Sequence, residues 1–285
     1  MNRIYACIDG SNSTACVIDW AAWCALRLNV PLELLHALEN NHERAPSPDL
    51  SGSLELGSQE QLLKELTEVD ARRSALALQL GDQLLASARR RALAAGAPDV
   101  HGRMRRDELS AAVMDMETDA RVFVLGKHAR PIESAKLHLD HHVERVIRAV
   151  KRPVLVTGTA PFQAPKSFVL AFDGSPTARS VVQAVAESAL LKGLKATIVH
   201  AGEPSAETQD QLAAAEAVLA GAGYGVRTVV HRGEPEDVLP RAISEAGASL
   251  LVMGAYGHSR IRQLIVGSTT TTLLRLSAVP VLILR

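Results

Sequence analysis

The strongest chemical signal in the chain is a group of glycines and hydroxyl residues near its C-terminal end. The segment GAYGHSRIRQLIVGSTTTT begins at Gly254 and contains the pattern Gly-x2-Gly-x9-Gly-Ser. Its first two glycines follow an apolar, strand-like run, so the backbone can turn sharply and bring amide N–H groups close to a ligand. The final Gly267-Ser268 pair precedes a helical pattern, whose N-terminal amides and positive dipole end favour a phosphate. The spacing predicts a nucleotide phosphate site, and a purely structural pair of strand–helix turns is the alternative.

Side chains within the same segment are expected to help hold the anion. Ser268 and Thr269 supply hydroxyl donors, and Arg260 or Arg262 supplies positive charge. The whole chain has 31 Lys plus Arg and 31 Asp plus Glu, so its formal charge is zero. Aromatic residues make up 3% of the sequence, too few for a base-stacking platform. We therefore expect binding through local groups, and no nucleic-acid partner.

Motifs that define common catalytic sites are missing from the sequence. It contains no G-x4-G-K-[ST] loop, no H-E-x-x-H pair and no G-x-S-x-G fragment. This favours a binding protein and leaves catalysis open, at most as slow hydrolysis of ATP. No apolar stretch is long enough to span a bilayer, and Cys7, Cys16 and Cys24 fit buried, reduced thiols better than a metal motif. We therefore expect a cytoplasmic protein without a membrane span.

The chain consists of two repeats of one unit, and this organisation must position the glycine motif. Asp9, Gly10 and His36 align with Asp173, Gly174 and His200 at an offset of 164 residues, without a gap. Later, Gly126 aligns with Gly254 at an offset of 128. The extra 36 residues lie in the first repeat, and we expect much of that excess to be a surface loop over Asn40–Ser58. The predicted domains are 1–158 and 166–285, joined by a short Pro-containing linker.

Within each repeat, strand-like and helix-like patterns alternate. Ile4–Ile8 and Phe168–Phe172 are short apolar runs typical of strands buried on both faces. Each ends in Asp-Gly-Ser, where Ser11 or Ser175 is expected to cap a helix, and Gly193 is expected to end the second of these helices. Further strands are expected at Ala196–His200, Val226–His231, Ser249–Met253 and Val279–Leu284, and further helices at Asp210–Ala220, Pro235–Ala246 and Ser268–Leu276. The alternation predicts an α/β fold with parallel sheets flanked by helices.

With these features the chain resembles the universal stress protein family, as a tandem two-domain member. The resemblance implies a five-stranded parallel sheet of order 3-2-1-4-5 in each repeat, the adenine nucleotide alpha hydrolase-like fold, with ATP, with or without Mg²⁺, as ligand of a stress-response protein. It implies an intramolecular pseudo-dimer in which Val154–Thr157 pairs with Val281–Leu284, with a further homodimer possible. The positions it assigns to the nucleotide are Asp173, His200, Ala201, Gly254, Gly257, His258, Arg260, Gly267, Ser268 and Thr269.

The first repeat departs from the motif. Gly126 remains, but Ala129 replaces the second glycine and Asp140-His141 replaces the Gly-Ser pair. A carboxylate at a phosphate position repels the ligand, so we expect ATP in the second repeat only. His138 and His142 are best explained as solvated residues rather than metal ligands. The alternative function is an interaction or scaffold protein of the same fold, which binds a protein or an apolar ligand instead of a nucleotide.

Overall fold

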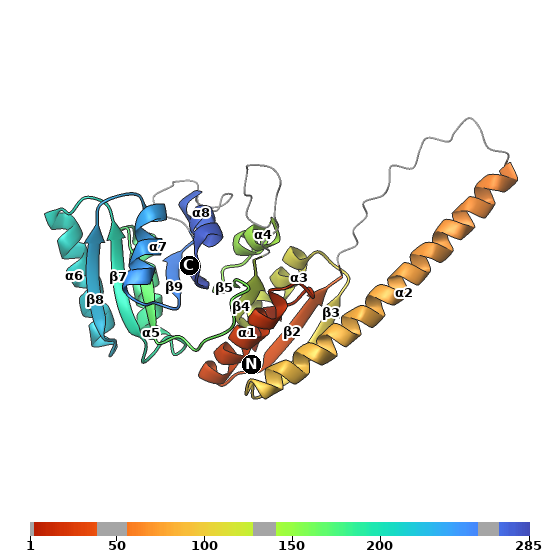
Figure 1. Cartoon of the computed structure of the whole chain (residues 1–285), viewed down its shortest axis with the longest axis horizontal. Coiled ribbons are helices and arrows are strands. Elements are labelled where there is room, and N and C mark those ends of the chain that lie inside the picture. Colours follow the sequence, from red (N-terminus) through yellow and green to blue (C-terminus); the bar gives the residue numbers. More distant parts are fainter. Residues whose placement is uncertain (1–2, 39–55, 128–140, 256–267) are drawn as a thin grey trace.

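The computed structural model describes residues 3–38, 56–127, 141–255 and 268–285, and Figure 1 shows its strands lined up in one sheet with helices on both faces. The first repeat contains β1 (Arg3–Cys7), α1 (Thr14–Leu28), β2 (Leu32–Ala37), α2 (Leu56–Ala94), β3 (Val100–Arg105), α3 (Leu109–Met116), a 3-10 turn (Glu117–Asp119), β4 (Ala120–Gly126), α4 (His141–Ala149) and β5 (Val154–Thr157). The second contains β6 (Ser167–Ala171), α5 (Pro176–Glu187), β7 (Lys195–Ala201), α6 (Ala206–Gly221), β8 (Val226–His231), α7 (Pro235–Glu245), β9 (Leu251–Gly254), α8 (Ser268–Leu276) and β10 (Val281–Leu284).

The two repeats share a single ten-stranded sheet. Its order is β3-β2-β1-β4-β5-β10-β9-β6-β7-β8, so each repeat has the order 3-2-1-4-5 that the family resemblance implies. All neighbours within a repeat are parallel. The exception is the central pair, where β5 and β10 run antiparallel with Val281 opposite Val156 and Ile283 opposite Val154. This is the closing-strand pairing that the family resemblance implies, formed here within one chain. The boundaries 1–158 and 166–285 stay a prediction.

Side chains at alternate strand positions belong to two different hydrophobic cores, one on each face of the sheet. Ile4 and Ala6 of β1 belong to the core that also contains residues of α1, α2, α5 and α6, whereas Tyr5 and Cys7 belong to the core that contains residues of α3, α4, α7 and α8. This is the period-two alternation expected for strands covered on both faces. Each core includes residues of both repeats, because the sheet is continuous through β5 and β10.

Contacts on one helical layer also join the repeats. The rings of Trp20 in α1 and Phe162 in the linker lie edge to face, with centroids 5.1 Å apart. Arg27, at the end of α1, donates from Nε to the carbonyl of Leu190 at 3.1 Å. The linker is therefore packed against the first repeat rather than free of it.

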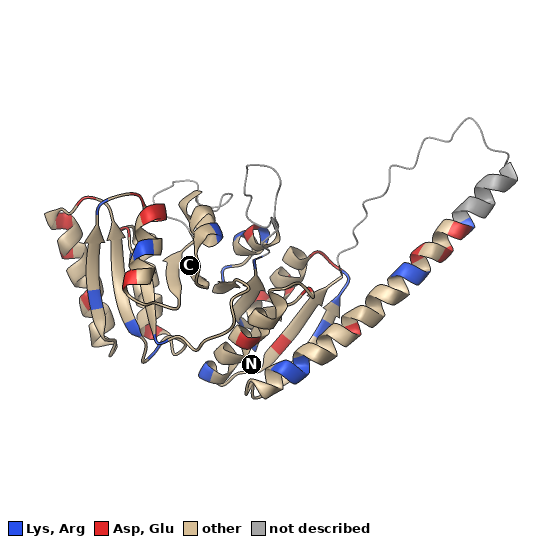
Figure 2. Cartoon of the chain, in the orientation of Figure 1, with Lys and Arg blue, Asp and Glu red and all other residues tan. Residues whose placement is uncertain are grey.

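Helix α2 corrects the expected loop over Asn40–Ser58. Residues 39–55 lie outside the described part of the chain, but Leu56–Ser58 already belong to α2. This helix has 39 residues, whereas its counterpart α6 has 16, so much of the extra length is helical. The segment has no proline and is rich in Leu, Ala, Gln, Glu and Arg, which favour helix. Acidic and basic side chains occur along it (Figure 2), and no described helix is both long and apolar enough to cross a bilayer.

Two expected helix ends also differ from the structure. The N-cap of α1 is Ser13 and not Ser11, because the Asp-Gly-Ser turn of the first repeat continues for two more residues before the helix begins. Helix α5 ends at Glu187 and not near Gly193. There the hydroxyl of Tyr224 donates to the carbonyl of Val185 at 2.9 Å, so a side chain from the next helix–strand connection satisfies an end carbonyl of α5.

Candidate functional site

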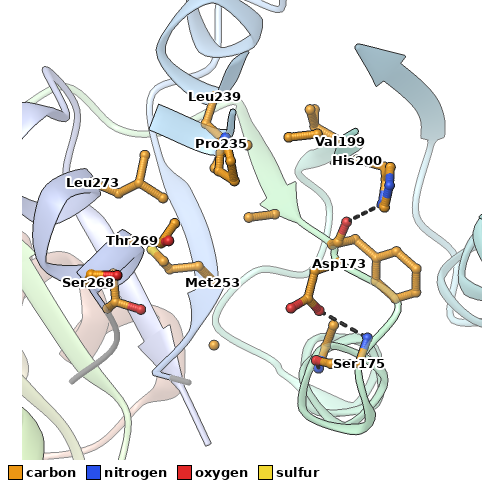
Figure 3. Close-up of a pocket in the computed structure, with 16 residues that line it drawn as sticks. Asp173, Ser175, Val199, His200, Pro235, Leu239, Met253, Ser268, Thr269 and Leu273 are labelled. Atoms are coloured by element: carbon orange, nitrogen blue, oxygen red, sulfur yellow. Dashed lines mark hydrogen bonds between the residues drawn. The ribbon is translucent and has the colours of Figure 1, made fainter. Parts of the chain in front are cut away.

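A cavity of about 480 Å³ lies at the carboxyl edge of the second repeat, where β6, β7 and β9 end. Parallel α/β sheets bind ligands at this edge, in the crevice beside the strand where the order reverses. Here that strand is β6, which lies between β7 and β9. The volume is within the range of small-molecule and cofactor sites. Figure 3 shows the lining side chains converging from α5, α7, α8 and the three strands.

The turn after β6 supplies one side of the cavity. Gly174 has a φ of 73°, a left-handed backbone conformation that favours glycine, and a Cβ there would also displace the flexible end of the Gln211 side chain. The turn lets the Asp173 carboxylate accept a hydrogen bond from the Ser175 amide at 3.0 Å, and Ser175 Oγ accepts from the Ala178 amide at 3.1 Å. Ser175 is thus the predicted N-cap of α5. In Figure 3 the Asp173 carboxylate points toward the side where Ser268 and Thr269 lie.

His200 lies at the end of β7, on the cavity wall. Its Nδ1 is 3.0 Å from the carbonyl oxygen of Phe172, which ties the ends of β7 and β6 together. In the first repeat, Nδ1 of His36 lies 2.8 Å from the carbonyl of Ile8 in the same way. The repeated contact gives both histidines a structural role at a strand end. Ala201 follows His200 and also lines the cavity.

The N-terminus of α8 forms the opposite side. Ser268 is exposed and Thr269 is half-buried, and both line the cavity. Thr270 is buried, and its hydroxyl donates to the carbonyl of Ala255 at 3.2 Å, which fixes the start of the helix against the end of β9. The first amides of any helix lack an acceptor within that helix, so a helix N-terminus such as that of α8 is suited to an anion.

An apolar wall completes the cavity, and the sequence analysis did not identify it. Pro235 and Leu239, one turn apart on α7, line it with Met253 of β9, Val199 of β7 and Leu273 of α8. Leu239 and Met253 are almost fully buried. Such residues look like ordinary core positions in a sequence. The one usable signal is the i, i+4 spacing of Pro235 and Leu239 on a helix that follows a strand end.

Six of the ten predicted site residues line this one cavity. They are Asp173, His200, Ala201, Gly254, Ser268 and Thr269. The other four, Gly257, His258, Arg260 and Gly267, lie outside the described residues. The described residues that line the cavity therefore provide an apolar wall, a carboxylate on one side and a helix N-terminus with hydroxyls on the other.

The corresponding region of the first repeat is arranged differently. Thr14 donates from its hydroxyl to the Asp9 carboxylate at 3.1 Å, whereas Ala178 stands at the equivalent position of the second repeat. Ser13 is 3% exposed, and its Oγ would lie 2.1 Å from a Cβ on Gly126. The first repeat thus fills with polar side chains the space beside Gly126, the counterpart of Gly254. The predicted substitution Asp140-His141 lies at the limit of the described residues, and the side chains of both are outside them.

Fold and site together define a class: a tandem pair of parallel α/β repeats with a cavity at the carboxyl edge of the second. Residues 1–158 and 201–285 match the family model described as the universal stress protein family. The chain is 34% identical over 288 residues to universal stress protein Slr1230 of Synechocystis sp. (strain ATCC 27184 / PCC 6803 / Kazusa), with all of both chains covered. The chain therefore belongs to the universal stress protein family.

Solved structures agree on the fold. A universal stress protein from Archaeoglobus fulgidus DSM 4304 superposes with a TM-score of 0.72 at 18% identity, covering 100% of this chain and 98% of that one. Protein PA1789 from Pseudomonas aeruginosa PAO1, of unknown function, superposes with a TM-score of 0.61 at 17% identity, covering 100% and 92%. The tandem architecture is thus shared over the full length of the chain.

Proposed function

We propose that the second repeat binds one adenine nucleotide, ATP, and that this binding serves stress signalling in the cytoplasm. The observation that carries the proposal is the cavity lined by Asp173, Ser268 and Thr269 together with an apolar wall. An aromatic base needs the apolar wall, a ribose needs an acceptor for its hydroxyls, and phosphates need amides and hydroxyls. These three requirements are met by three sides of one cavity.

The orientation follows from where these groups lie. The base would lie against Pro235 and Leu239, beside the backbone of Ala201, and the ribose hydroxyls would donate to the Asp173 carboxylate. The phosphates would then extend toward the N-terminus of α8 and the glycine motif. Among the described residues no group of three or more His, Cys, Asp or Glu side chains could hold a metal. We therefore propose that any Mg²⁺ arrives on the phosphates rather than in a protein-built site.

Binding, not turnover, is the proposed activity. His200 already uses Nδ1 to hold the Phe172 carbonyl, and Asp173 accepts from the Ser175 amide. These bonds position the two groups for structure and binding, and they support at most slow ATP hydrolysis. Phosphate release that is lost in Asp173→Asn, with contaminating ATPases excluded, would instead establish an enzyme.

Calorimetric titration with ATP tests the proposal, and the duplication supplies a matched control. The wild-type chain should bind at about one site per chain. Asp173→Asn removes the anionic acceptor and should weaken binding by about tenfold or more, because a hydrogen bond to a charged group contributes about 1.5–3 kcal/mol. Asp9→Asn, the same change in the first repeat, should leave the affinity unchanged. No heat at millimolar ATP, or two equal sites, would contradict the proposal.

The alternative is that the cavity binds an apolar ligand and no nucleotide. Mass spectrometry of small molecules released from the denatured, freshly purified protein separates the two. Recovery of ATP or ADP supports nucleotide binding. Recovery of a hydrophobic compound, together with a silent ATP titration, supports the alternative.

A further inference from the structure

The outer part of α2 exposes large apolar side chains that nothing in the described structure covers. Leu66, Val69, Leu76 and Leu80 are 53%, 60%, 58% and 60% exposed. The C-terminal part of the same helix, with Ala88 and Ala92, packs into a core, whereas the outer part projects away from the sheet (Figure 1). A contiguous exposed apolar surface on a folded protein marks an interaction site.

The spacing of these residues is that of a two-helix seam. Counted along α2, Leu66, Val69, Arg73, Leu76 and Leu80 are separated by three, four, three and four residues. This is the heptad pattern, in which one face of a helix packs lengthwise against another helix. Four of its five positions are apolar, and the fifth is Arg73. A single helix of this kind projecting into water gains no packing energy, so its apolar face needs a second helix.

We propose that the outer part of α2 pairs with α2 of a second copy of this chain, as an antiparallel two-helix coiled coil centred on Ala71. In this register Leu66 lies opposite Leu76 of the second copy, and Val69 lies opposite Arg73 of the second copy. The two-fold axis generates each of these two residue pairs a second time, so both copies use the same surface of α2. The core-packed parts of the two helices then point in opposite directions, which keeps the two folded bodies apart.

The charges on α2 favour this orientation over the parallel one. In the antiparallel register Arg73 lies one residue along the axis from Asp70 of the second copy, on the same side of the seam. On the other flank Arg72 lies two residues along the axis from Arg72 of the second copy and five residues from Glu65 of the second copy, so the preference rests on Arg73. A parallel pair would place Arg73 against Arg73, and Glu65 against Asp70, both unfavourable. A polar residue at one seam position is a known means of fixing register and orientation.

Light scattering coupled to gel filtration tests the pairing, with the full chain at roughly 50 µM. The wild type should elute at twice its 30.5 kDa chain mass. Leu76→Glu should raise the dissociation constant about 100-fold, because it puts two charges into each seam. Met114→Glu is the matched control, since Met114 on α3 is 56% exposed and outside the seam. A monomeric wild type, or a dimer that Leu76→Glu leaves intact, would overturn the proposal.

Charge exchange and crosslinking test the orientation. Arg73→Asp should weaken the dimer, and adding Asp70→Arg should restore it, because the pairs are re-formed with reversed signs. The native cysteines are all buried, so new surface thiols can be crosslinked without them. A mixture of Val69→Cys and Arg73→Cys chains should give the heterotypic disulfide dimer in excess of both homotypic dimers. A prevailing Val69→Cys homodimer would show a parallel pair and refute the proposed arrangement. Neither experiment uses a nucleotide, so failure here leaves the proposed function standing.

Discussion

Lys127 of the first repeat donates a hydrogen bond from Nζ to the carbonyl oxygen of Ser277 in the second repeat, at 2.6 Å. The same ammonium donates to the carbonyl of Leu274 at 3.2 Å. Leu274 lies in the last turn of α8 and Ser277 directly follows it, at the helix end where carbonyls lack intrahelical partners and the dipole favours a cation. Since Ser268 and Thr269 at the other end of α8 line the cavity, a residue of one repeat supports the site of the other.

Lys127→Met should therefore lower the free energy of unfolding by about 1–2 kcal/mol, because it leaves two helix-end carbonyls without a donor. It should also weaken ATP binding, whereas Lys127→Arg should retain most of both properties. Urea unfolding and calorimetry measure the two effects. Lys192→Met removes an exposed lysine and serves as the control. An unchanged affinity in Lys127→Met would show that α8 keeps its position without this contact.

The two serine caps of the second repeat provide a second comparison. Ser175 accepts from the Ala178 amide at 3.1 Å and Ser205 accepts from the Thr208 amide at 3.0 Å, so either change to Ala should cost about 1 kcal/mol of stability. Ser175 also belongs to the turn that presents Asp173. Ser175→Ala should therefore weaken ATP binding as well, whereas Ser205→Ala should not. Equal affinities in thermal-shift and calorimetric titrations would contradict the proposed role of the turn.

Gly126 and Ser13 should show strong coupling in a double-mutant cycle. A Cβ at Gly126 would lie 2.1 Å from Ser13 Oγ and 2.7 Å from Ser13 Cβ, so Gly126→Ala should destabilise the fold by about 1–3 kcal/mol. Ser13→Gly removes both atoms and keeps an acceptable N-cap residue. The double variant should therefore be more stable than Gly126→Ala alone. Additive free energies of unfolding would show that the two positions do not meet.

The cysteine thiols should be unreactive in the native protein. Burial raises the pKa of Cys7 to about 12 from an ordinary value near 9, and burial also raises the pKa of Cys16 and Cys24. Because the folded pKa is raised, the thiol form is the one that the fold stabilises. This contribution is fully present below about pH 9 and is lost as the pH rises from there toward 12. A thiol reagent at pH 8 should label no cysteine before denaturation and three after it, and rapid native labelling would contradict this.

The repeat offset was enough to predict two copies of one α/β unit, whereas the strand order 3-2-1-4-5 came from the family resemblance. Asp173 and His200 are brought together because each lies at the carboxyl end of a strand that the alignment of the repeats defines, and Ser268 joins them as the first residue of α8. The apolar wall was not predictable, since Pro235 and Leu239 resemble any inward-facing helix residues until the fold shows what they face. Lys127 was missed for a different reason: its acceptor lies 150 residues away along the chain.

The length of α2 was not predicted from the sequence. Much of the extra length of the first repeat was assigned to a surface loop, because the stretch before the helix is rich in Pro, Ser and Gly. The sequence did contain a signal for a long helix, namely a run rich in helix-forming residues from Leu56 to Ala94. Propensity alone does not say how far a helix continues beyond its packed part. The heptad spacing of Leu66, Val69, Leu76 and Leu80 is the feature that distinguishes a functional extension from an accidental one.

The antiparallel pairing of β5 with β10 gives the first repeat a structural role that does not depend on ligand binding. Without β5, the backbone of β10 would become an open sheet edge carrying four consecutive apolar residues, the kind of surface that pairs with other strands and aggregates. Each core would also lose part of its lining, since both extend through the centre of the sheet. The first repeat would therefore still be needed if it bound no ligand, because its strand β5 covers the edge of β10 and so protects the second repeat from aggregation.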